Sequence, residues 1–219
     1  MKKLSILIAS ILIIVFNANA QTQKGDQNLG LGFNFNTGSG SYIYVMPIEL
    51  GTITSTYFAA SPAYSYFIAN NLDLGASVGF GTGTYQTNYN EPSPSSTSKQ
   101  VTDDYTATLY LRKYFLFNNK IGIRTGPYLL YQYYNSNVVN NPGDPTQNFS
   151  NSGKNLQAGI SADFVYYPSK RIGLAVNLGG LYYTNQKTYS TSQNSTNSTV
   201  DFQFLNTNLM LSAFYVIGH

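Results

Sequence analysis

Cysteine is absent from this chain of 219 residues, and charged residues are scarce. Without cysteine the protein has no disulfide, no thiolate metal ligand, no cysteine nucleophile and no lipid-modified cysteine. Charged side chains make up 10% of the sequence, against about 25% in a typical soluble domain. Since soluble surfaces are normally charged, this composition indicates a surface that faces another solvent or is neutral and sugar-like.

Histidine is nearly absent as well, because the only one is His219 at the terminus. A Ser-His-Asp triad or a histidine metal site is therefore not expected, and we predict a protein that is not an enzyme and needs no cofactor. The pair Asp103-Asp104 could hold calcium weakly, although solvated loop charge is the interpretation we favour. The formal net charge of +3 falls by two if Lys2 and Lys3 are removed. The remaining basic residues are scattered, so nucleic acid is not an expected partner.

The first 20 residues have the pattern of a secretory signal peptide. Lys2 and Lys3 precede the apolar run Leu4 to Phe16, and Ala18-Asn19-Ala20 fits a small-residue cleavage site. The alternative is a membrane anchor, but the run is shorter than the roughly 20 residues of a spanning helix. We predict a signal peptide at 1–20, a polar lead-in at 21–27 and one domain at 28–219. No later stretch is apolar enough to span a membrane as a helix.

Alternation of apolar and small residues is the main pattern of the domain. In the hairpin from Ser61 to Thr84, every second residue after the short turn at 69–71 is apolar, and the residues between are small or polar. Strands place successive side chains on opposite faces, so one face is apolar. The same pattern predicts eight strands, near 28–38, 61–69, 72–84, 103–117, 121–135, 153–167, 172–182 and 201–217.

Short and long connections alternate between these strands. The short turns follow Ala69, Phe117 and Tyr167, and the expected long loops are 39–53, 86–102, 136–152 and 184–200. A repeated hairpin with alternating connections is typical of an antiparallel up-and-down barrel. Pro127 falls within one predicted strand and is expected to mark an irregularity there.

The bulk of the side chains indicates which face is outside. Eight strands enclose a space that ordinary side chains just fill, and the small faces carry glycine, serine, threonine and asparagine. The bulky faces of leucine, isoleucine, phenylalanine and tyrosine then contact lipid. The alternative is a soluble barrel or sandwich with the bulky face inward.

Aromatics at strand ends are expected to form interfacial girdles, here Tyr66, Phe67, Phe115, Phe117, Tyr166 and Tyr167 near the short turns, and Tyr85, Tyr105, Tyr131, Tyr133 and Tyr182 near the long loops.

With this signal peptide, eight strands and hairpins such as SPAYSYFIANNLDLGASVGFG, the chain resembles the small OmpA- and OmpX-like outer-membrane β-barrels of Gram-negative bacteria. The resemblance covers 28–219. It implies an all-β, eight-stranded transmembrane barrel in the outer membrane, with short periplasmic turns and long extracellular loops. It also implies contact with outer-membrane lipid and lipopolysaccharide, and with the barrel-assembly machinery. That family usually ends on an aromatic residue, whereas this chain ends on Gly218-His219, with Tyr215 nearby.

Four charged residues fall on the small, inward face: Asp73, Arg112, Arg124 and Asp163. Arg112 and Arg124 lie opposite each other across the Asn118-Asn119 turn, and Asp163 is on the next strand. We interpret them as a lumen charge network that plugs the barrel; the alternative is a narrow polar or anion-preferring path. Asp73 is nearer the turns and is expected to face water there.

These observations leave three functions open. The first is a non-enzymatic barrel of the cell envelope that presents polar loops for adhesion, binding of an unknown extracellular ligand, or envelope integrity. The second is a small, porin-like channel for small solutes. The third is a soluble secreted β-protein that binds sugar or lipid.

Overall fold

The computed structural model describes residues 22–45, 48–89, 96–140, 148–190, 194–204 and 210–218. The predicted signal peptide and His219 lie outside the described residues. Nine strands are present in this part of the chain: β1 (Gln27–Val45), β2 (Ile48–Ala69), β3 (Leu72–Tyr89), β4 (Ser96–Phe117), β5 (Ile121–Asn140), β6 (Phe149–Tyr166), β7 (Ile172–Ser190), β8 (Asn194–Phe204) and β9 (Met210–Ile217). In the described ranges, no helix is long and apolar enough to cross a membrane.

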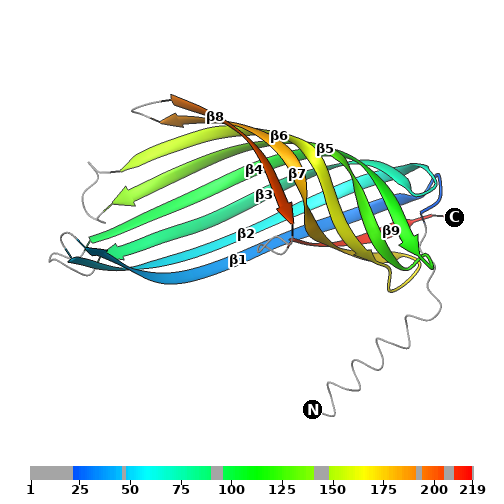
Figure 1. Cartoon of the computed structure of the whole chain (residues 1–219), viewed down its shortest axis with the longest axis horizontal. Coiled ribbons are helices and arrows are strands. Elements are labelled where there is room, and N and C mark those ends of the chain that lie inside the picture. The colour runs from blue at the N-terminus through cyan, green and yellow to red at the C-terminus, as the bar shows by residue number, and fades with distance from the viewer. Residues whose placement is uncertain are drawn as a thin grey trace, which may run out of the picture.

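The strands form one antiparallel sheet that closes on itself (Figure 1). From β1 to β7 each strand pairs with the next along the chain. The ring closes where β9 lies between β1 and β7. Around this closure the barrel has eight strands, β1 to β7 and β9, so the predicted antiparallel up-and-down barrel is confirmed. We call the end with the short connections after Ala69, Phe117 and Tyr166 the turn end, and the opposite end the distal end.

The last predicted strand, 201–217, corresponds to two strands. Among the described residues β8 pairs with β7 alone, and β1 beyond Asn34 pairs with β2 alone. Toward the distal end β1 and β8 therefore diverge, as Figure 1 shows. All residues of β8 are exposed. Phe202 and Phe204 lie on β8 and not on β9, so their alternation is independent of the apolar face of β9.

The predicted long loops are wrong, because strands cover most of them. β2 and β4 each have 22 residues, whereas a tilted strand crosses a bilayer with about 9–11. The added segments are rich in threonine, serine, tyrosine and asparagine. Ladder hydrogen bonds satisfy their backbone without an apolar face, and threonine and tyrosine favour strands. The barrel wall therefore continues as polar strands well beyond any membrane-spanning part.

Asparagine supplies the backbone conformations of two short turns. Asn71, between β2 and β3, has a φ of 60°, and Asn118 and Asn119, between β4 and β5, have φ values of 49° and 52°. The amide of Lys120 donates to the carbonyl of Phe117 at 3.1 Å and closes the second turn. Positive φ at both central residues defines a turn whose twist matches a hairpin, and asparagine tolerates this region.

A bulge in β7 reverses the alternation expected for its second half. The register with β6 shifts between Ala162 and Asp163, and the opposite strand has Gly179 at a φ of +131°. Beyond this point Leu181 and Tyr183 are exposed, whereas Tyr182 lines the interior cavity. Assigning Tyr182 to the outer face was therefore wrong, because one extra residue in a strand moves every following side chain to the other face.

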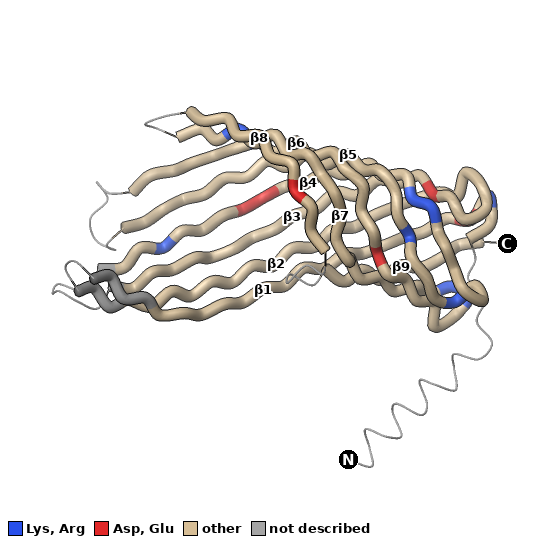
Figure 2. The backbone as a smooth tube through the Cα atoms, in the orientation of Figure 1, with Lys and Arg blue, Asp and Glu red and all other residues tan. Residues whose placement is uncertain are grey.

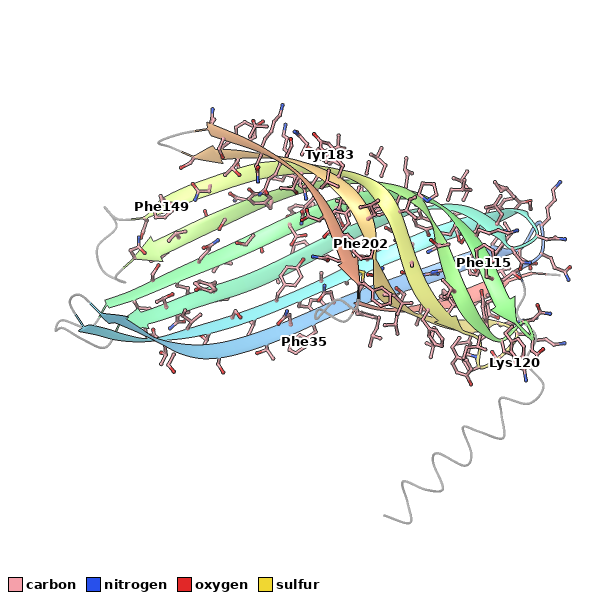
Figure 3. All side chains as sticks on the ribbon, viewed as in Figure 1. Phe35, Phe115, Lys120, Phe149, Tyr183 and Phe202 are labelled. Atoms are coloured by element: carbon pink, nitrogen blue, oxygen red, sulfur yellow. The ribbon has the colours of Figure 1, made fainter. Side chains whose placement is uncertain are left out.

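Large apolar side chains cover the outside of the barrel (Figure 3). Val78 is 62% exposed and Phe115 60% exposed, and similar residues lie on every strand of the closed ring. Most of the side chains between them point inward and are small or polar, except for a group of large buried side chains near the turn end. A continuous exterior of large apolar side chains is stable only against lipid, and ring closure leaves no free edge there. The assignment of the bulky face to the exterior is confirmed.

Arginine in the middle of this exterior tests its contact with lipid. We expect Val78→Arg to lower the free energy of unfolding by about 2–4 kcal/mol, because a midplane cation on the lipid face is poorly solvated. Thr54→Arg is the control: Thr54 is also exposed but lies in the distal extension of β2, where we expect a change of about 0–1 kcal/mol. Urea titration in lipid vesicles, followed by circular dichroism, measures both. Equal losses would contradict a lipid-facing position for Val78.

Candidate functional site

An apolar layer closes the turn end of the barrel from inside. We call it the floor; it consists of Phe67, Tyr114, Val165, Tyr167, Ala175, Phe214 and Val216. Its rings are in contact, tilted for Phe67 and Tyr114 with centroids 5.3 Å apart, and edge-to-face for Tyr167 and Phe214 with centroids 5.5 Å apart. A Cβ at Gly173 would overlap the ring of Phe214, so only glycine leaves room for that ring.

Two floor residues correct the predicted aromatic girdle. Phe67 and Tyr167 are fully buried, although they were expected to lie at the membrane interface. Each directly follows a tyrosine of the opposite phase, Tyr66 or Tyr166, so alternation turns it inward. The narrow end of a small barrel needs large side chains to fill it, and these rings do so.

The polar lead-in is docked against the turn end. The amide of Gly25 donates to the carbonyl of Phe67 at 2.9 Å, and the amide of Phe67 donates to the carbonyl of Asp26 at 2.9 Å. The amide of Asn71 donates to the carbonyl of Thr22 at 2.7 Å. Residues 22–26 thus extend the pairing of β2 and help to close this end.

The first of two ion pairs lies above the floor, between β3 and β4. Arg112 donates through Nε to Oδ1 of Asp73 at 3.1 Å and through Nη2 to Oδ2 at 2.6 Å. Oδ2 of Asp73 also accepts from Ser65 at 2.7 Å and from Tyr114 at 3.1 Å. The guanidinium stacks 3.8 Å from the centroid of the Tyr110 ring. Because Asp73 is fully buried, these donors replace the water that the carboxylate loses.

The second ion pair joins β5 to β6. Arg124 donates through Nε to Oδ2 of Asp163 at 2.7 Å, and Asn177 donates to Oδ1 of Asp163 at 2.8 Å. Nη1 of Arg124 lies 3.5 Å from the hydroxyl of Tyr114. Tyr114 therefore links both pairs into one network at one height in the barrel.

The structure brings all four charged residues proposed from the sequence into this network. Register explains the pairs, since Asp73 is opposite Arg112 and Arg124 is opposite Asp163. The expectation that Asp73 faces water was wrong, because the floor and the lead-in separate it from the turn end. Whether the network plugs the barrel or serves a polar path stays a prediction.

A cavity of about 480 Å³ lies between the network and the distal end. Arg112, Arg124 and Asp163 line the part of the cavity nearer the turn end, and Asp104 lines the part nearer the distal end. Figure 2 shows how few charged residues the barrel carries. The wall between them combines amides, hydroxyls and tyrosine rings with glycine, alanine and larger apolar side chains.

Asp104 is the residue that sequence reasoning missed. It is 5% exposed and accepts hydrogen bonds from the Tyr57 hydroxyl at 2.9 Å and from Nε2 of Gln132 at 3.2 Å. The interpretation as solvated loop charge was wrong for Asp104, because β4 begins at Ser96. The alternation along the strand does predict an inward side chain for Asp104, because it lies two residues before Thr106 and therefore on the same face.

The ring closure and the lipid-suited exterior define a transmembrane β-barrel of the outer-membrane type. Similar solved structures include Ail, the attachment invasion locus protein of Yersinia pestis, with 13% identity over 89% of this chain and 100% of that one and a TM-score of 0.40. A major outer membrane protein from Thermus thermophilus has 12% identity over 89% and 100% of the two chains and a TM-score of 0.42. The outer membrane protein OprG from Pseudomonas aeruginosa has 10% identity over 93% and 100% and a TM-score of 0.40.

No protein-family model and no curated protein matches the chain. The class therefore rests on this chain's own strand pairing and exterior.

Proposed function

We propose that this protein is a non-enzymatic, non-conducting barrel of the outer membrane of a Gram-negative bacterium that uses its distal strands to contact ligands at the cell surface. The observation that carries the proposal is the contrast between the two ends. The turn end is filled by the floor and the ion-pair network, and the distal end extends as long polar strands.

The closed turn end supports a role other than conduction. Phe67, Val165, Tyr167 and Val216 are fully buried, and Tyr114 is 2% exposed. A solute path would have to displace these rings and separate two hydrogen-bonded ion pairs. A conducting barrel instead needs a continuous polar lumen.

The distal strands support surface contact. They hold hydroxyl and amide side chains on a hydrogen-bonded scaffold, for example Ser98 donating to Asn140 at 2.6 Å and Gln100 to Ser136 at 2.8 Å. Such side chains form hydrogen bonds with glycans and proteins without charge attraction. A scaffold of paired strands loses less conformational entropy on binding than flexible loops do.

A pair of lysines supports contact with anionic lipid and this orientation in the membrane. Lys154 on β6 and Lys187 on β7 are opposite each other in register and exposed, toward the distal side of the apolar exterior. Like charges directly opposite each other destabilise a sheet, and an anionic group between them removes the repulsion. Lipopolysaccharide phosphates in the outer leaflet would supply such a group.

The proposal is tested with two barrels displayed on cells. One is unmodified, and in the other the segments 39–53, 86–102, 136–152 and 184–200 are replaced by short turns. We expect at least tenfold weaker attachment of the shortened barrel to a panel of immobilised glycans and matrix proteins. We also expect the unmodified barrel to be silent in planar bilayers. Attachment that is unchanged by shortening, or stable conductance of the unmodified barrel, would overturn the proposal.

A further inference from the structure

The carboxylate of Asp104 is buried without a counter-ion. Of the charged side chains on the cavity wall, Arg112 pairs with Asp73 and Arg124 with Asp163. Within the described ranges no cation forms a salt bridge with Asp104, whose partners are the Tyr57 hydroxyl and the Gln132 amide. A buried charge without an opposite charge is costly, so the cavity carries one uncompensated negative charge.

Three amide residues of the cavity lining have an acceptor without a partner. Asn155 donates through Nδ2 to Oε1 of Gln132 at 3.5 Å, and Gln132 in turn donates to Asp104. With these donors used, the buried Oδ1 of Asn155 has no hydrogen-bond partner among the described residues. The same holds for Oδ1 of Asn28 and of Asn34, and all three residues line the cavity. Orphaned acceptors are rare in folded proteins, and here several share one cavity.

Glycine makes room for this arrangement. Gly81 lies on β3 between Ala59 of β2 and Asp104 of β4. A Cβ at Gly81 would overlap both the Tyr57 hydroxyl and the Asp104 carboxylate. The tyrosine and the carboxylate can therefore meet across β3 only because that position has no side chain.

We propose that this cavity binds a small organic cation, an ammonium or guanidinium compound, with Asp104 as its counter-charge. The ligand must supply both positive charge and N–H donors, because the cavity wall holds a carboxylate without an opposite charge and amide carbonyls without a donor. Tyr57, Tyr128 and Tyr182 also line the wall, and aromatic rings attract cations. A metal ion fits less well, because calcium takes six to eight oxygen ligands and the described residues contain no cluster of acidic or histidine side chains.

The site is reached from the distal end, since the floor closes the other. The proposal does not depend on a surface role for the distal strands, because ligand binding in the lumen is measured on the isolated barrel. Failure of one proposal therefore leaves the other intact.

The test uses the folded barrel in nanodiscs and isothermal titration calorimetry at low salt. The probes are 1,4-diaminobutane, the neutral 1,4-butanediol and the anionic succinate, which share a four-carbon length. We expect saturable binding of the diamine alone, weakened by added salt because screening reduces charge attraction. No saturable diamine binding, or equal binding of the diol or succinate, would overturn the proposal. So would displacement of the diamine by an equal concentration of Mg²⁺.

Substitutions locate the site. Asp104→Asn should weaken diamine binding at least tenfold, while the neighbouring Asp103→Asn, whose carboxylate accepts from Thr82, should leave it unchanged. Asn155→Asp adds a second carboxylate beside the first and should strengthen binding several-fold. Unchanged affinity in both Asp104→Asn and Asn155→Asp would refute the assignment. The probe series and the Asn155→Asp variant decide the outcome independently of whether Asp104→Asn folds, which heat-dependent gel mobility reports.

Discussion

Replacing Asp73 by alanine is expected to lower the free energy of unfolding by about 3–5 kcal/mol, because Arg112 then remains buried without its counter-ion. Ser65 and Tyr114 lose the same acceptor, which adds to the loss. Urea titration in lipid vesicles, followed by circular dichroism and by heat-dependent gel mobility, measures the change.

The control for this experiment is Asp103→Ala. Asp103 lies on the neighbouring strand but forms no ion pair within the described residues, so we expect a loss below about 1 kcal/mol. The double variant Asp73→Ala with Arg112→Met should recover part of the stability, since replacing both partners leaves no uncompensated charge. A loss for Asp73→Ala no greater than that of the control would show that the ion pair does not stabilise the barrel.

Opening the floor is expected to produce conductance in a barrel that we propose to be non-conducting. The double variant Tyr114→Ala with Tyr167→Ala removes two buried rings and the hydroxyl that links the two ion pairs. We expect single-channel conductance to appear in planar bilayers. We also expect a loss of about 3–5 kcal/mol for each ring, by analogy with other buried aromatics.

The matched control removes the adjacent rings of the same two strands. Phe115→Ala with Tyr166→Ala acts on the outer phase, where Phe115 is exposed, and should leave the barrel silent. Conductance in the control would mean that general destabilisation opens the barrel. A silent floor variant would mean that other groups, such as the docked segment 22–26, suffice to close the turn end.

The alternation of apolar and small residues in the sequence was sufficient to predict the barrel and the direction of most side chains. Leu74, Val78 and Leu109 were expected outside and are exposed. The four charged residues on the small face proved to be neighbours across strands, because distance from a hairpin turn fixes register. Counting from the turn at 118–120 already placed Arg112 and Arg124 at similar heights.

The distal half could not be predicted in the same way. Segments such as 96–102 and 184–190 are polar on both faces, so they lack the contrast that identifies a strand. They are strands because the neighbouring strand offers an unpaired ladder to continue. Asp104 lies at the boundary between such a segment and the predicted strand 103–117, where the polar sequence favours solvated loop charge.

What the sequence determines by itself is local: period-two patterning, asparagine turns and a small inner face against a bulky outer one. These follow from steric and solvation preferences that act within a few residues. Tertiary structure decided how far the strands pair, how β9 closes the ring while β8 leaves it, and how a bulge at Gly179 turns Tyr182 inward. It also buried Asp104 inside the barrel without an ion pair among the described residues. Each of these depends on which backbone lies next to which, and that is settled only when distant strands meet.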